Sequence, residues 1–248
     1  MKVAIFSDLH IREDDQKLNL AFAKLLRELV EVEKITDLWL LGDILDVLVG
    51  PFSFWFDSYK EIFDALKILK QKGVNILWFE GNHDFFIQRL LHKIDIEVAD
   101  GEQTYVVGEK KQKLLLAHGD LVNPEDKDYL VWRKITRSMG YRMVLGSLPS
   151  IVVKNFLKPW AQVISDKSRQ KSSEHGLDLK KMYRNFAQKK FSEGYDAVIL
   201  GHCHVEDFFQ EGNKFYLNLG SALDGTVRYA IWDVEHESFP NALKYSKM

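Results

Sequence analysis

The 248-residue sequence lacks the features that would place it outside ordinary globular proteins. Its single cysteine, Cys203, excludes an internal disulfide framework and is typical of a reducing compartment. Five prolines and fifteen glycines are too few for a collagen-like or low-complexity chain. The longest apolar region, from Leu38 to Phe56, is interrupted by Asp43, Asp46 and Pro51, which makes it a poor membrane span. We therefore expect a soluble, cytoplasmic protein.

What the sequence does contain is an uneven distribution of charge. The net charge is only -2, but residues 121–190 hold 15 basic and 6 acidic residues, or +9. The remainder has 19 basic and 30 acidic residues, or -11. A basic segment beside an acidic core suggests an anionic substrate or an anionic surface, and solvated helix faces explain the charges equally well. A nucleic-acid partner is not expected, because no basic groove with interleaved aromatic residues can be recognised.

Short apolar runs alternate with helical patterns along much of the chain. Apolar residues at helical spacing predict helices from Leu18 to Leu29 and from Tyr59 to Leu69. The last two apolar runs predict an antiparallel pair of strands with a turn at Asp224-Gly225. The pattern indicates an α/β layered core, residues 1–120 and 191–248, with a helical cap insertion at residues 121–190. Strands are predicted at Val3–Phe6, Leu38–Leu41, Ile76–Phe79, Leu114–Ala117, Val198–Leu200, Phe215–Leu219 and Arg228–Val234.

Polar clusters follow five of these predicted strands. Open α/β sheets gather their ligands at the carboxyl edge, and Asp, Asn and His donors suit Mn, Fe or Zn. If the backbone is extended, side chains alternate between its two sides, so Asp8 and His10 face one cavity, and so do His202 and His204. The same alternation turns Cys203 toward the core. Each cluster alone is a weak signal, but five in this order predict a metal site. The clusters are Asp8-Leu9-His10, Gly42-Asp43, Gly81-Asn82-His83-Asp84, His118-Gly119-Asp120 and Gly201-His202-Cys203-His204.

This order of motifs resembles the signature of the calcineurin-like metallophosphoesterases, and the resemblance extends from Asp8 to His204. It implies a four-layer α/β fold, in which a β-sandwich of two mixed sheets is flanked by helices. It also implies two divalent metal ions, with Mn expected first and Fe or Zn as alternatives. The resemblance assigns Asp8, His10, Asp43 and His204 to one ion, and Asp43, Asn82, His118 and His202 to the other, with Asp43 bridging. It makes Asp43, Asn82 and His83 the catalytic set.

Two further acidic residues belong to the same motifs. Asp84 and Asp120 are expected to orient ligand histidines or turn backbones without binding metal themselves. Simple turn capping is the alternative for both residues.

The layout of the whole chain is similar to one branch of that family, the UDP-2,3-diacylglucosamine pyrophosphatases of lipid A biosynthesis. That branch has a similar length, a helical cap between the last two motifs, and an acidic-aromatic stretch that here ends at Tyr129. The resemblance implies hydrolysis of an acylated nucleotide-sugar to UMP and 2,3-diacylglucosamine 1-phosphate, with peripheral contact at the cytoplasmic face of the inner membrane. Substrate contacts are expected from Asn82, His83, Asp126, Lys167, Ser168, Lys171 and His202.

The cap carries apolar residues that suit such a substrate. They could line an acyl-binding groove, while Lys167, Arg169 and Lys171 could meet the pyrophosphate. An apolar stripe at helical spacing equally serves helix packing. The apolar residues are Met143, Val144, Leu148, Ile151, Val152, Phe156, Leu157 and Trp160.

One position departs from that branch. The branch commonly carries arginine after Gly-Asn, whereas this chain has His83, as general phosphodiesterases and phosphatases of the superfamily do. His83 could protonate the leaving group or act as a cation, whereas arginine could only be a cation. A hydrogen bond to a neighbouring residue is the third alternative for His83. His83 leaves open a phosphodiesterase or phosphatase with another phosphoester substrate. A binding scaffold of the same fold without metals is a separate alternative.

Overall fold

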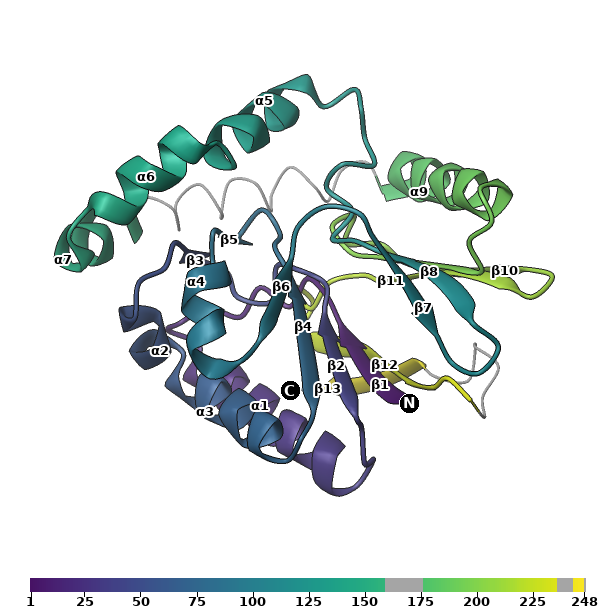
Figure 1. Ribbon diagram of the computed structural model, residues 1–248, viewed down its shortest axis with the longest axis horizontal. Coiled ribbons are helices and arrows are strands. Elements are labelled where there is room, and N and C mark those ends of the chain that lie inside the picture. Colours follow the sequence, from purple (N-terminus) through teal and green to yellow (C-terminus); the bar gives the residue numbers. More distant parts are fainter. Residues whose placement is uncertain (159–175, 236–242, 248) are drawn as a thin grey trace.

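Two β-sheets packed face to face form the centre of the molecule (Figure 1). The structure is a computed structural model that describes residues 1–158, 176–235 and 243–247, without the side chains of 176–177 and 243–247. The first sheet has the order β13-β12-β1-β2-β4-β6, in which β1, β2, β4 and β6 are parallel and β12 and β13 are antiparallel to their neighbours. Its strands are β1 (Lys2–Phe6), β2 (Asp37–Leu40), β4 (Asn75–Phe79), β6 (Glu97–Ala99), β12 (Thr226–Asp233) and β13 (Leu243–Lys247).

The second sheet has the order β10-β11-β9-β8-β7. Its three central strands are parallel, and the edge strands β10 and β7 pair antiparallel to them. A separate short parallel pair joins β3 (Leu48–Val49) to β5 (Asp84–Phe85). The strands of the second sheet are β7 (Gln103–Val107), β8 (Gln112–Leu116), β9 (Ala197–Leu200), β10 (Glu206–Glu211) and β11 (Lys214–Leu219).

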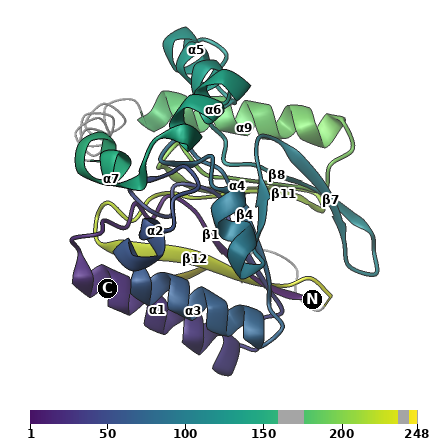
Figure 2. The same ribbon diagram turned by 60° about the vertical axis from the view of Figure 1, so that its left-hand side comes forward.

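Helices cover the outer face of each sheet, so the molecule has four layers (Figure 2). On the first sheet lie α1 (Gln16–Glu31) and α3 (Lys60–Gln71), whose apolar residues recur at helical spacing and are buried against the strands. On the second sheet lies α9 (Gly176–Ser192). Shorter elements are α2 (Phe54–Ser58), α4 (Gln88–Leu91) and the 3₁₀ turn η1 (His92–Ile94). The predicted four-layer fold of two mixed sheets flanked by helices is confirmed.

Three apolar cores separate these layers. Between the sheets, side chains such as Trp39, Ile199 and Trp232 are buried in one cluster. The other two cores lie between each sheet and its helices, where Phe22 and Tyr183 are among the fully buried side chains. Each such side chain stabilises the fold by about 1.5–3 kcal/mol through removal of apolar surface from water. The strands are thereby held on both faces, which makes a rigid platform for the loops at their ends.

The predicted antiparallel pairing of the last two strands is wrong. β11 pairs with β9 and β10 in the second sheet, whereas β12 pairs with β1 and β13 in the first sheet. The segment between them crosses from one sheet to the other and includes Gly220 and Gly225, both with positive φ. Both strands are mostly buried along their length, so no clean polar alternation marks their partners.

The insertion begins with helices that lie over the loops of the first sheet (Figure 1). No strand occurs among its described residues, 121–158 and 176–190. Asp126 caps α5 and Ser138 caps α6, and Arg137 lies between the two helices. No helix in the described ranges is long and apolar enough to cross a bilayer. The elements are α5 (Lys127–Thr136), α6 (Met139–Ser147), α7 (Ser150–Val152) and a π-helical segment η2 (Val153–Leu157).

Candidate metal centre

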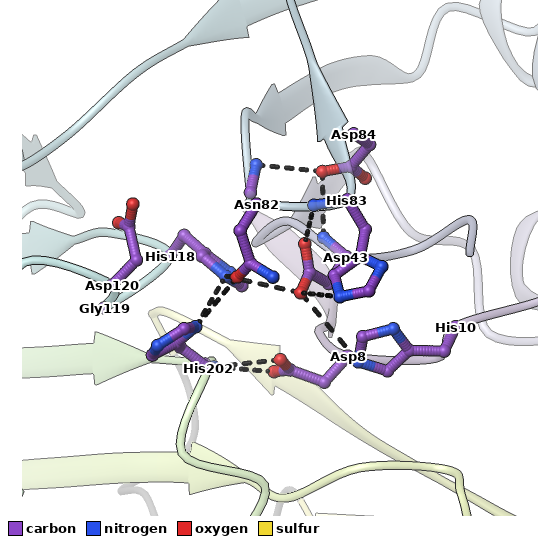
Figure 3. A network of polar contacts seen from close by, with 12 residues as sticks. Asp8, His10, Asp43, Asn82, His83, Asp84, His118, Gly119, Asp120 and His202 are labelled. Atoms are coloured by element: carbon purple, nitrogen blue, oxygen red, sulfur yellow. Dashed lines mark hydrogen bonds and ion pairs between the residues drawn. The ribbon is translucent and has the colours of Figure 1, made fainter. Parts of the chain in front are cut away.

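The five polar motifs occupy loops that follow β1, β2, β4, β8 and β9, and these loops meet between the two sheets (Figure 3). Because all five strands belong to the parallel parts of their sheets, their carboxyl ends can supply one common site. The predicted meeting of the five motifs at one place is therefore present. It brings together residues that are nearly 200 positions apart in the sequence.

The backbone that presents these side chains is strained. Asp8, His10, Asp43, His202 and His204 all have left-handed φ angles, between 47° and 69°. The extended backbone assumed for the Asp8/His10 and His202/His204 pairs is thus wrong, and tight left-handed turns orient the side chains instead. Such conformations are costly for residues other than glycine and concentrate at functional sites.

Cys203 is buried within the core between α9 and the second sheet, as predicted. Its burial raises the pKa of the thiol to about 12. Cys203 is therefore an inert core residue at neutral pH.

One cluster of ligand atoms contains Asp8, His10, Asp43 and His204. The Nε2 atoms of His10 and His204 lie 3.0 Å apart. His204 Nε2 is 3.5 Å from Asp8 Oδ1, and His10 Nε2 is 3.9 Å from Asp43 Oδ2. A nitrogen ligand lies about 2.0–2.1 Å from a zinc ion, so two such ligands on one ion are roughly 3 Å apart. The spacing of the two histidines fits a shared metal ion.

A second cluster contains Asp43, His118 and His202, with Asn82 beside them. Asn82 Oδ1 lies 3.1 Å from His118 Nε2 and 3.0 Å from His202 Nδ1. The two histidine nitrogens are 3.2 Å apart, and His118 Nε2 is 3.6 Å from Asp43 Oδ2. These four residues present two imidazoles and two oxygens, a donor set of intermediate hardness.

Asp43 is common to both clusters. Its Oδ1 accepts a hydrogen bond from the backbone N–H of His83 at 2.9 Å. Its Oδ2 is buried and accepts no hydrogen bond from any described residue. A buried carboxylate oxygen without a donor is costly, and a cation removes that cost. The donor chemistry and this oxygen together fit two divalent ions bridged by Asp43.

The histidine rings of the second cluster differ in their tendency to hold a proton. Burial lowers the pKa of both His118 and His202, but the negative charges of Asp43, Asp8 and Asp120 reverse the effect for His118 and raise its pKa. His202 keeps a lowered pKa, because burial and the charge of His118 outweigh the nearby carboxylates. A metal ion needs both rings neutral, so binding would release the proton from His118.

Asp84 holds the loops of Asp43 and Gly81 together. Its carboxylate accepts hydrogen bonds from the backbone N–H groups of Asp43, Ile44 and Gly81, and from the indole of Trp78, at 2.8–3.0 Å. Burial and the negative charge of Asp43 raise the pKa of Asp84 to about 7. Asp84 thus supports turn backbones, one of the two expectations for this residue.

Asp120 points away from the clusters (Figure 3). It accepts hydrogen bonds from the Tyr129 hydroxyl at 2.5 Å and from Arg133 Nε at 2.6 Å. Burial opposes its ionisation, but the positive charges of His118, His202 and Arg133 lower its pKa to about 2. Asp120 therefore links the His118 loop to α5, a role that the sequence did not indicate.

His83 lies at the rim of the two clusters. Its Nδ1 is 2.9 Å from the carbonyl oxygen of Asp46, which can only accept, so Nδ1 carries the proton. Its Nε2 is 4.0 Å from Asp43 Oδ2, and its ring packs edge-on against His10 at 4.7 Å. The fixed tautomer directs Nε2 toward the clusters, where it could donate a proton when the ring is charged.

The expected substrate residues fall into three groups. Asn82 and His202 belong to the second cluster, and His83 lies at the rim of the two clusters. Asp126 is exposed and caps α5 through the N–H of Tyr129. Lys167, Ser168 and Lys171, together with Arg169 and Trp160, lie outside the described residues.

The apolar residues of α6 to η2 are divided between two faces. Leu145 and Val153 are buried against the core, in keeping with the helix-packing alternative. Most of the others are exposed, as the acyl-groove alternative requires, and Phe156 reaches 72%. The most exposed are Met139, Met143, Val144, Ile151 and Phe156.

Comparisons with known proteins agree with the motifs. A family model described as calcineurin-like phosphoesterase matches residues 1–206. UDP-2,3-diacylglucosamine hydrolase of Haemophilus influenzae is 26% identical over 223 residues, 89% of this chain and 90% of that protein. The protein of the same name from Stutzerimonas stutzeri is 28% identical over 179 residues, 69% of this chain and 70% of that protein. A solved archaeal phosphodiesterase is 17% identical, with 100% of both chains covered and a TM-score of 0.49.

Proposed function

The chain belongs to the calcineurin-like phosphoesterase family and is a metal-dependent hydrolase, and we propose that it cleaves the pyrophosphate of UDP-2,3-diacylglucosamine. The products would be UMP and 2,3-diacylglucosamine 1-phosphate, as in lipid A biosynthesis. The observation that carries this proposal is that relatives of that name match nearly the whole chain, the insertion included. The exposed apolar face of the insertion supports it, because acyl chains need such a surface.

We assign the metal-ligand role to the residues of the two clusters, with Asp43 between them. Two divalent ions held there would supply Lewis-acid polarisation of a phosphoryl group and would lower the pKa of water. Manganese is the proposed metal, with iron or zinc as alternatives, because Asp, Asn and His suit all three. Asn82 and His83 would contact the phosphoryl oxygens, and His83 Nε2 would hold a proton near the leaving group.

The product would be a lipid, so we propose that the protein works at the cytoplasmic face of the inner membrane. The exposed apolar side chains of α6 to η2 lie on the same elements as an exposed basic residue, Lys154. A surface that combines apolar and basic side chains favours binding to an anionic bilayer.

The substrate is tested by release of UMP from UDP-2,3-diacylglucosamine in the presence of Mn²⁺. A soluble UDP-sugar and a bis-aryl phosphodiester are assayed in parallel. We expect the acylated substrate to have the highest kcat/KM, because only it contacts the insertion. Turnover of the aryl diester alone would overturn the lipid proposal. It would favour a general phosphodiesterase, the class in which a histidine at the position of His83 is usual.

Asp43→Ala serves as the control for all three substrates. It removes the oxygen shared by the two clusters, so metal content and turnover should fall together. A loss of several kcal/mol of transition-state stabilisation corresponds to about 10³-fold in rate. An active Asp43→Ala enzyme with normal metal content would contradict the assignment of the centre.

A further inference from the structure

Arginines at the start of the insertion reach the loops that carry the metal motifs. Arg133 and Arg137 are four residues apart and therefore project from the same side of the helix. Arg133 donates to Asp120 at 2.6 Å and to Asp100 at 2.5 Å. Asp100 follows β6 of the first sheet and Asp120 follows β8 of the second. The helix α5 is thus tied to both sheets beside the metal centre.

Arg137 makes a different set of contacts. Its side chain is only 8% exposed, and its Nη2 donates to the carbonyl oxygen of Gly81 at 2.7 Å. Its Nε lies 3.6 Å from Glu80 Oε2 and 3.6 Å from Asp100 Oδ2. Its guanidinium also lies over the ring of Phe85, 4.6 Å from the centroid. A buried guanidinium in these contacts has little freedom to move.

Glu80 holds this arginine from the side of the sheet. It directly follows β4, is buried, and its Oε1 accepts the N–H of Ile87 at 2.9 Å. Its Oε2 faces Arg137 and Arg142, each at 3.6 Å. A carboxylate buried at this position needs nearby cations. Both cations, Arg137 and Arg142, come from the insertion.

The contact of Arg137 with Gly81 acts on Asn82. The Gly81 carbonyl belongs to the planar peptide group that also contains the N and Cα atoms of Asn82. A hydrogen bond to that oxygen therefore restricts the position of the Asn82 backbone. Asn82 Oδ1 must remain near His118 and His202. A Cβ on Gly81 would collide with Asp43 Oδ1, so the loop has no space to move toward Asp43. Asp43 and Arg137 therefore both restrict the loop.

We propose that Arg137 is a positioning residue for the Gly81-Asn82-His83 loop, held in place by Glu80. It contacts none of the ligand atoms itself and acts through the Gly81 peptide. The insertion thereby contributes to the chemistry of the metal centre as well as to substrate binding. This inference requires the metal centre to be assigned correctly, but it does not depend on the lipid substrate.

The test compares Arg137→Gln with Arg137→Lys, using a bis-aryl phosphodiester that is too small to need the insertion. Loss of a residue that orients a metal ligand typically reduces activity by about 10–100-fold, and we expect a fall of that size in the kcat of Arg137→Gln. KM for the small diester should stay unchanged, because Arg137 lies behind the loop. Arg137→Lys keeps the charge and a donor for Gly81 and should recover most of the rate.

Arg184→Gln is the matched control, since Arg184 also binds a buried carboxylate, Asp207, but contacts no metal motif. It should lower the melting temperature and leave kcat unchanged. Hydrogen–deuterium exchange in metal-free protein adds a second measurement: residues 80–87 should exchange faster in Arg137→Gln and normally in Arg184→Gln. Wild-type kcat and exchange in Arg137→Gln would overturn the proposal. Failure to cleave the lipid substrate, with the aryl diester still cleaved, would contradict only the proposed function.

Discussion

At the scale of single residues, His83 distinguishes two kinds of transition-state support. Its Nδ1 proton is hydrogen-bonded to the Asp46 carbonyl oxygen. A second proton on Nε2 therefore makes the ring both a cation and an acid. Arginine at this position could supply the charge but not the proton. The choice between these roles depends on how strongly the leaving group needs protonation.

We therefore expect His83→Arg to lose rate mainly on substrates with poor leaving groups. General acid catalysis contributes about 10²–10⁴-fold, and an aryl series from nitrophenol to phenol leaving groups should show the loss growing along the series. The measurement is kcat/KM for each diester in wild type and variant. Equal losses across the series would exclude the acid role and leave only the cationic one.

That the residues of the five motifs lie close together could be predicted from the sequence, because each motif follows an apolar run and together they match a known order. The predicted geometry was less successful, since left-handed φ angles at Asp8 and His202 are not visible in residue types. Glu80 and Arg137 were not predicted at all. They are 57 positions apart, neither belongs to a motif, and their role exists only because α5 folds over the loop after β4.

At the scale of elements, local patterns predicted strands better than their partners. The buried central strands were predicted, but the short pieces β3, β5 and β6 were not, because two or three residues carry no periodicity. The longer strands β7, β10 and β13 were missed as well. The error over β11 and β12 has the same origin. A glycine turn between two apolar runs favours a hairpin locally, whereas each of these strands finds its neighbours in a different sheet.

The attachment of α9 to the second sheet provides a prediction at this scale. Asp207 on β10 accepts two hydrogen bonds from Arg184 at 2.6 Å and lies 2.9 Å from Lys180 Nζ. Burial opposes ionisation of Asp207, but these partners outweigh it and lower its pKa. A lowered pKa in the folded state stabilises the protein above the unfolded pKa, and this contribution disappears as the pH falls through the folded value.

Asp207→Asn should therefore destabilise the protein at neutral pH and have no such effect in strong acid. Because Arg184 and Lys180 are partly exposed and screened by water, we expect a loss of about 1–2 kcal/mol at pH 7. The difference from wild type should vanish below the lowered pKa of Asp207. Denaturant unfolding at several pH values measures this, and a difference that persists unchanged into acid would contradict the ion-pair explanation.

At the scale of the whole molecule, the uneven charge has an explanation that composition alone could not provide. Composition left an anionic partner and solvated helix faces equally plausible for the basic insertion. The structure shows a third role for the basic residues of the insertion, because many of them pair with acidic residues of the two-sheet core. The pairs are Arg133 with Asp100 and Asp120, Arg137 and Arg142 with Glu80, Lys158 with Glu13, Lys180 and Arg184 with Asp207, and Lys190 with Glu102.

The metal centre joins the two sheets, so metal binding should stabilise the entire fold. Asp8, Asp43 and Asn82 come from loops of the first sheet, and His118 and His202 from loops of the second. A ligand present at a hundredfold excess over its Kd stabilises the folded state by about 2.7 kcal/mol. For a chain of this length that corresponds to a rise of roughly 5–10 °C in Tm for each ion bound.

Removal of metal with a chelator should therefore lower the Tm by that amount, and added Mn²⁺ should restore it. Without the ions, the buried carboxylates of Asp43 and Asp84 repel each other with less compensation; burial and this repulsion together raise the pKa of Asp84. Asp43→Ala is the control, because its Tm should respond weakly or not at all to Mn²⁺. Calorimetry at constant pH and ionic strength makes the measurement, and a wild-type Tm indifferent to metal would show that the clusters do not bind ions in the folded protein.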